Sequence, residues 1–210
     1  NSNLTSIYFF LHFQYNGWIF FAYIGLFSSW LFQYKVTIAS EKIIFYLFVS
    51  ACIPAYFLSA LWLVIPVWLY VVVVIAASMQ VYAWFMFFFF FWRYRMQIKS
   101  SIHVFTKNLL LLVCAALTIK LLLQLGSTLP ALSKLAFGFR PIVIAYLHLV
   151  LLGVITAFLL VYLFANNYLP NDKLSMRGTL LFITGIVLNE MVLALQGIAS
   201  FSYLAIPHAQ

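Results

Sequence analysis

Two histidines stand inside long apolar runs of this sequence, His12 in IYFFLHFQYNGWIFF and His148 in PIVIAYLHLVLLG. An ionisable side chain within a lipid bilayer is costly, so a histidine in such a run is a candidate for a functional role. Imidazole ligates haem iron, copper and zinc alike. If both histidines lie at one depth, they predict a single site for haem b, or for a copper or zinc ion, with His12 and His148 as its ligands.

Three polar residues close to His12 in the sequence are expected to orient its ring. Tyr8, Tyr15 and Asn16 share a helical face with His12, since they lie three or four residues from it. Phenol and amide groups at such positions hold a ligating imidazole through hydrogen bonds. The alternative is a polar network that only joins neighbouring helices.

Lys120 and Glu190 are the charged residues that we expect within membrane spans. Pairing with each other, or facing a water-lined cavity, keeps the cost of their burial low. Glu190 would then load and unload a proton, or the two residues would form an ion pair that fixes the register of two helices. Arg140, eight residues before His148, is a candidate partner for haem propionates at the outer surface, or else an interfacial anchor.

The elements that must position these residues are transmembrane helices. The chain has 210 residues, of which 67% are hydrophobic and only 7% are charged, so a soluble domain is excluded because it could not cover its core. Apolar runs of about 18 or more residues recur, and each is long enough to cross the hydrocarbon layer as a helix. We predict one all-α membrane bundle with six spans, at about 6–32, 43–60, 64–92, 108–126, 141–165 and 178–204.

Basic residues indicate the orientation of this bundle. Eight of them follow the first, third and fifth predicted spans, and only Lys134 and Arg140 lie in the loops on the other side. This asymmetry places the eight in the cytoplasm and both termini outside. The net charge of +8 then marks loops that face an anionic membrane surface rather than a nucleic-acid partner. His12, Lys120 and His148 each lie six or seven residues below the outer ends of their spans, and so at a similar depth.

The sequence leaves two boundaries open. Pro54 and Pro66 interrupt a continuously apolar stretch without a charged loop, so residues 43–92 form two spans or include a re-entrant segment. The chain starts at Asn1 rather than Met, and we expect it to be part of a longer protein.

The segments YLHLVLLG around His148 and LHFQYNGW around His12 resemble histidine-bearing helices of the haem–copper oxidase catalytic-subunit superfamily and its small relatives. The resemblance implies that His12 and His148 are axial ligands of a low-spin haem near the outer face. The superfamily also needs further histidines for copper and a second haem, and no other predicted span contains one. The resemblance therefore does not extend to an oxygen-reducing centre within these residues.

Three functions follow as hypotheses. The first is a redox protein of a bacterial inner membrane that passes electrons to a quinone or to another membrane subunit. The second is a transporter or channel that uses Lys120 and Glu190, with helices broken at Pro54 and Pro66. The third is a scaffold subunit without catalytic residues. The sequence contains no nucleophile–base arrangement and no glycine-rich phosphate loop, so hydrolase and nucleotide chemistry are not expected.

Overall fold

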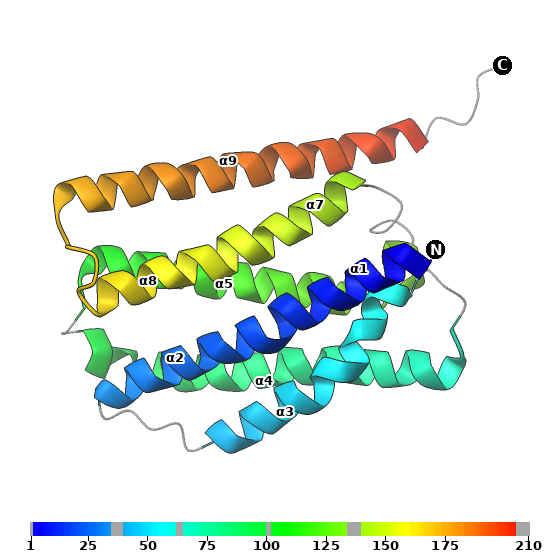
Figure 1. Cartoon of the computed structure of the whole chain (residues 1–210), viewed down its shortest axis with the longest axis horizontal. Coiled ribbons are helices and arrows are strands. Elements are labelled where there is room, and N and C mark those ends of the chain that lie inside the picture. Colours follow the sequence, from blue (N-terminus) through cyan, green and yellow to red (C-terminus); the bar gives the residue numbers. More distant parts are fainter. Residues whose placement is uncertain (1, 35–39, 62–64, 100–101, 134–139, 205–210) are drawn as a thin grey trace.

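The computed structural model describes residues 2–34, 40–61, 65–99, 102–133 and 140–204. Within these ranges every regular element is helical, and the helices lie lengthwise beside one another (Figure 1). Five helical stretches are long and apolar enough to cross a membrane: Glu41–Ala60, Val67–Tyr94, Val104–Gly126, Pro141–Ala165 and Lys173–Gly197. The prediction of an all-α membrane bundle is thus confirmed, while the sixth span and the outward orientation of both termini stay predictions.

The first helical stretch runs from α1 (Ser2–His12) through the π-helical segment η1 (Phe13–Trp18) into α2 (Ile19–Gln33). It covers the predicted span 6–32. It is not among the five apolar stretches, and it carries polar residues at positions 12, 14 and 16. Gly17 has non-helical backbone angles (φ −90°, ψ −111°), so the helix is kinked next to this polar segment.

The second and third predicted spans form a helix pair. α3 (Glu41–Ala55) continues into the short 3₁₀ helix η2 (Tyr56–Ala60), and α4 (Val67–Lys99) packs against α3. Both members of the pair are long and apolar enough to span the membrane, which favours two spans over a re-entrant segment.

The remaining helices complete the bundle. α5 (Val104–Gly126) packs against α4, and it also contacts a continuous rod made of α7 (Arg140–His148), the π-helical segment η3 (Leu149–Thr156) and α8 (Ala157–Ala165). The last helix, α9 (Lys173–Leu204), packs mainly on α7 and leaves most of its surface exposed (Figure 1). An apolar helix with so little protein contact is suited to a lipid environment.

The bundle has two different ends. One end carries basic residues where helices begin or finish, and we call it the basic end: Lys42, Arg93, Lys107, Lys173 and Arg177. The opposite end, where α1 begins and α5 finishes, is called the far end. Large apolar side chains fill the core of the basic half: Phe27, Trp30, Leu31, Phe91, Leu110, Phe158 and Phe164. The far half contains the polar side chains that the sequence singled out.

Candidate functional site

A buried cluster of polar side chains forms around His12 in the far half. His12 is only 4% exposed, and its Nε2 donates a hydrogen bond to the backbone oxygen of Cys52 at 2.9 Å. The Asn16 Nδ2 group donates to His12 Nδ1 at 3.2 Å from one helical turn away. A neutral imidazole with its proton on Nε2 satisfies both contacts. Each ring nitrogen of His12 is therefore engaged with a protein group.

The carbonyl of Cys52 is available because of a change in helix type. At the end of α3 the backbone tightens, so the N–H of Tyr56 donates to Ile53 O and not to the carbonyl four residues back. That carbonyl belongs to Cys52, and it accepts from His12 instead. Pro54 lies inside this last turn and lacks an N–H, which weakens the regular helix at this point. The local break in α3 thus provides the hydrogen-bond acceptor that fixes the His12 ring.

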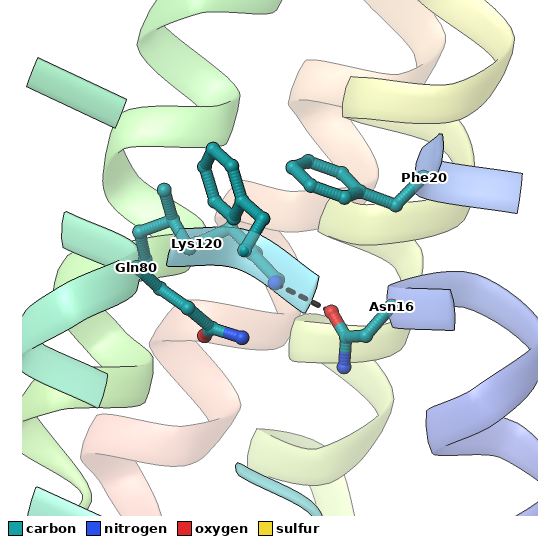
Figure 2. Close-up of a pocket in the computed structure, with 6 residues that line it drawn as sticks. Asn16, Phe20, Gln80 and Lys120 are labelled. Atoms are coloured by element: carbon teal, nitrogen blue, oxygen red, sulfur yellow. Dashed lines mark hydrogen bonds between the residues drawn. The ribbon is translucent and has the colours of Figure 1, made fainter. Parts of the chain in front are cut away.

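Lys120 completes the buried cluster from α5. It is 4% exposed, and its Nζ donates to Asn16 Oδ1 at 2.5 Å (Figure 2). Asn16 therefore connects His12 to Lys120 through the two ends of one amide. Among the described residues, the contact between a basic and an acidic side chain is that of His148 with Glu190 at 3.6 Å, so Lys120 has no acidic partner in this part of the chain. We refer to His12, Asn16 and Lys120 as the buried cluster.

A second pair of buried amides lies beside the buried cluster and was not singled out from the sequence. Gln124, one turn after Lys120, donates from Nε2 to Gln80 Oε1 of α4 at 2.9 Å. Gln80 also lines a small cavity together with Lys120 and Asn16. The sequence contains a feature that could have identified Gln80, because it is the only amide side chain in the apolar stretch 67–94. A polar side chain within such a stretch is expected to face protein.

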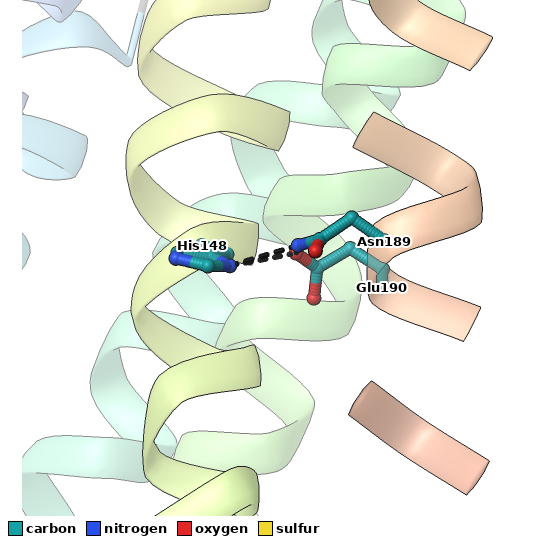
Figure 3. A network of polar contacts seen from close by, with 3 residues as sticks. All are labelled: His148, Asn189 and Glu190. Carbon is teal, nitrogen blue, oxygen red and sulfur yellow. Dashed lines mark hydrogen bonds and ion pairs between the residues drawn. The ribbon is translucent and has the colours of Figure 1, made fainter. Parts of the chain in front are cut away.

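His148 belongs to a different cluster, on the outer side of α7. Its Nδ1 accepts from Asn189 Nδ2 at 2.9 Å and lies 3.6 Å from Glu190 Oε1, so both side chains of α9 approach the same ring nitrogen (Figure 3). The His148 side chain is 38% exposed. The two histidines thus have different neighbours: His12 contacts α3 and reaches α5 only through Asn16, whereas His148 contacts α9.

Lys120 and Glu190 do not meet in the described structure, contrary to the ion pair expected between them. Lys120 contacts Asn16, and Glu190 contacts His148 and Asn189. The physical reason is the packing of the last helix, because α9 lies on α7 and has no comparable contact with α5. A similar depth in the membrane was therefore insufficient to bring these two charges together.

The structure describes the remaining candidate residues to different extents. Tyr8 and Tyr15 are partly buried in the first helical stretch. Arg140 opens α7, but its side chain lies outside the described residues, as does the whole of Lys134. Asn16, which was expected to orient His12, donates a hydrogen bond directly to its ring.

The described contacts do not fit a haem or metal ion shared by His12 and His148. A ligating imidazole needs a ring nitrogen with a free lone pair, and both nitrogens of His12 are engaged. The cavity beside Lys120 measures about 10 Å³, whereas pockets for organic ligands measure about 300–1,000 Å³. The described residues also hold no group of three or more His, Cys, Asp or Glu side chains that could bind a metal ion.

The chemistry available at the buried cluster is proton binding. The imidazole of His12, the amide of Asn16 and the amine of Lys120 are hydrogen-bonded in a row. The groups at the two ends of this row, the imidazole and the amine, can each gain or lose a proton. Comparisons with protein-family models, with curated proteins and with solved structures find no match, so the function of this chain is inferred from its own residues and contacts.

Proposed function

We propose that this chain is an integral membrane protein that binds and releases a proton at Lys120, in the half of the membrane opposite the basic loops. The observation that supports this proposal is the contact of a buried amine with a neutral amide and with no acidic side chain. Lysine changes its protonation state readily when it is buried, which is why proteins use buried lysines as bases. His12 is the second proton-binding group of the same cluster.

Uptake from one side is favoured over transport across the bundle. The far half contains the buried cluster and the Gln80–Gln124 pair, whereas aromatic and aliphatic side chains pack the basic half. A proton needs polar groups or water along its path, since charge in an apolar environment costs several kcal/mol. In the described residues such groups are concentrated at one end. The proton would serve a reaction or a conformational change on that side of the membrane.

The direct test is a titration of Lys120 by NMR on isotope-labelled lysine in detergent micelles. The resonance of Lys120 is identified by its loss in Lys120→Met. We expect this resonance alone among the lysines to change between the amine and ammonium forms within the pH range where the protein stays folded. Lys107→Met, on the same helix near the basic end, is the matched control and should leave the titration unchanged. A Lys120 that keeps one form throughout this range would overturn the proposal.

A redox subunit with haem b, copper or zinc remains a second proposal. It is favoured by one observation, that a π-helical segment starts directly after each histidine: η1 after His12 and η3 after His148. Such segments are frequent at functional sites. Ligation of one haem or metal ion by both histidines would require His12 to give up its hydrogen bond to the Cys52 carbonyl and His148 to turn toward His12. Optical spectra of oxidised and reduced protein, with elemental analysis, test this proposal, and a featureless spectrum without iron, copper or zinc would reject it.

A further inference from the structure

The cavity beside Lys120 has an unusual lining for the interior of a membrane protein. Its wall consists of three polar and three apolar side chains: Asn16, Gln80, Lys120, Phe20, Phe48 and Leu121 (Figure 2). Its volume of about 10 Å³ is enough for one water molecule or one monatomic ion.

The polar groups that remain available to the cavity are hydrogen-bond donors. Lys120 has three N–H groups and uses one of them on Asn16 Oδ1. Gln80 accepts from Gln124 through its Oε1, so its amide nitrogen is the group left on the cavity side (Figure 2). Asn16 has its oxygen on Lys120 and its nitrogen on His12. The cavity therefore offers N–H donors from Lys120 and Gln80, while each of its two amide oxygens already accepts one hydrogen bond.

The chain itself does not supply a counter-charge for a protonated Lys120. Its three acidic residues all lie elsewhere: Glu41 is exposed at the start of α3, Asp172 is exposed before α9, and Glu190 contacts His148. The titratable groups near Lys120 are His12, linked through Asn16, and Cys52, whose carbonyl holds His12. A buried cation without an opposite charge is strongly unfavourable, so protonation of Lys120 calls for an anion from outside the chain.

We propose that this cavity binds a small monovalent anion of the size of chloride, and that the anion enters together with the proton on Lys120. The inference deepens the proposed function and depends on it, since the anion compensates the charge that protonation creates. Donor groups around a cation prefer an anion to water, because each N–H bond to a charged acceptor is stronger. The size of the cavity excludes polyatomic anions such as sulfate and gluconate.

The first experiment measures thermal unfolding of the purified protein in detergent, in chloride and in gluconate at equal ionic strength, over a series of pH values. Chloride should raise the Tm and gluconate should not, because a ligand that binds the folded state stabilises it. Above the pH at which Lys120 loses its proton, the apparent chloride affinity should fall about tenfold per pH unit, as linkage between one proton and one anion requires.

Two variants separate an anion from a general salt effect. Gln80→Glu places a carboxylate in the cavity wall, so the chloride dependence should disappear while Lys120 still titrates in the NMR experiment. Gln33→Glu makes the same substitution on the exposed end of α2, and this control should keep the chloride dependence of the unmodified protein. If Gln80→Glu also keeps that dependence, the anion lies elsewhere and the inference is wrong.

The possible results distinguish binding of the anion from binding of the proton. A Lys120 that titrates without any effect of chloride means that the cavity holds water only, which overturns the anion site and leaves the proposed function intact. A chloride effect that is independent of pH, and that Lys120→Met removes, means a permanently charged lysine. This result supports the anion site but overturns coupled uptake and the proposed function.

Discussion

The two halves of the bundle are held together by different interactions. Nine polar or charged side chains are buried in the described residues, and seven of them lie toward the far end: His12, Asn16, Gln80, Lys120, Gln124, Thr128 and Ser133. Thr106 and Thr179 are the two near the basic end. There the core consists instead of aromatic rings in close contact, such as Phe27 with Phe91 at 5.6 Å and Phe105 with Phe164 at 5.4 Å.

The two kinds of packing place different requirements on the side chains. Apolar packing in the basic half needs no particular partner for each side chain, only a close fit. Hydrogen bonds in the far half need defined partners, because a buried polar group without one is costly. Substitutions in the basic half should therefore change stability alone, whereas substitutions in the far half should change stability together with proton binding.

The largest expected effect is the loss of a core ring in the basic half. Phe164 is 1% exposed, and Phe164→Ala should reduce the free energy of unfolding by about 3–5 kcal/mol, because a cavity forms in a packed core. Unfolding by denaturant in bicelles measures this loss. Phe32→Ala, at the exposed surface near the same end, is the matched control and should cost no more than about 0.5 kcal/mol. Equal losses in the two variants would show that this core is not packed as described.

A somewhat smaller loss is expected from Asn16→Leu in the far half. This substitution leaves both His12 Nδ1 and Lys120 Nζ without a partner, and two such groups should cost about 3 kcal/mol together. The Lys120 resonance should also change its titration, which no variant of the basic half should cause. Asn108→Leu, exposed near the start of α5, serves as control. An unchanged titration in Asn16→Leu would remove the contrast between the halves.

The His148 contact should matter much less than the buried cluster. Glu190→Gln removes the charge 3.6 Å from a half-exposed histidine, and partly exposed ion pairs contribute less than about 1 kcal/mol. We expect little change in the unfolding free energy and no change in the titration of Lys120. If Glu190→Gln alters a pH-dependent flux in vesicles, the cluster on α9 has a transport role that its exposure does not predict.

The smallest effect concerns the first turn of α9, outside the apolar core. The Ser175 side chain and its backbone N–H, which donates to Asp172 Oδ1 at 2.8 Å, lower the pKa of Asp172. A lowered pKa means that the carboxylate stabilises this helix start above its unfolded pKa, and that the contribution is lost as the pH falls through the folded pKa. Hydrogen exchange of this turn should speed up in acid. Asp172→Asn should remove the pH dependence, and a persistent dependence would point to another group.

Much of the fold was predictable from hydropathy, because the length of an apolar run determines where a helix can lie. The predicted segments 6–32, 108–126 and 141–165 each fall within a helix or a continuous helical rod of the structure. The proline-rich boundary was harder to assign. Pro54 lies inside the last turn of α3, and the helix continues into η2 instead of ending at the proline.

The contacts of the candidate site were less predictable than the helices. The level of Lys120 in the membrane followed from its distance to the end of its span, and the structure places it beside Asn16. Its lateral direction did not follow, since that depends on which helices are neighbours. The partner of His12 on α3 is a backbone carbonyl, which no pattern of side chains reveals. The same limitation applied to Asn189, whose role depends on α9 packing against α7.

The π-helical segment η3 has a consequence for how the direction of His148 could change. A π-helical turn contains one residue more than an α-helical turn, so deletion of a single residue within Leu149–Thr156 would restore a regular helix. Because the wider turn accommodates that residue, residues 140–148 would keep roughly the same direction relative to α8 after the deletion. Deletion of one residue from a part of the rod that is already α-helical would instead rotate them by about 100° and take His148 away from Asn189 and Glu190. The π-helical segment thus allows this rod to hold one more residue while His148 keeps its partners on α9.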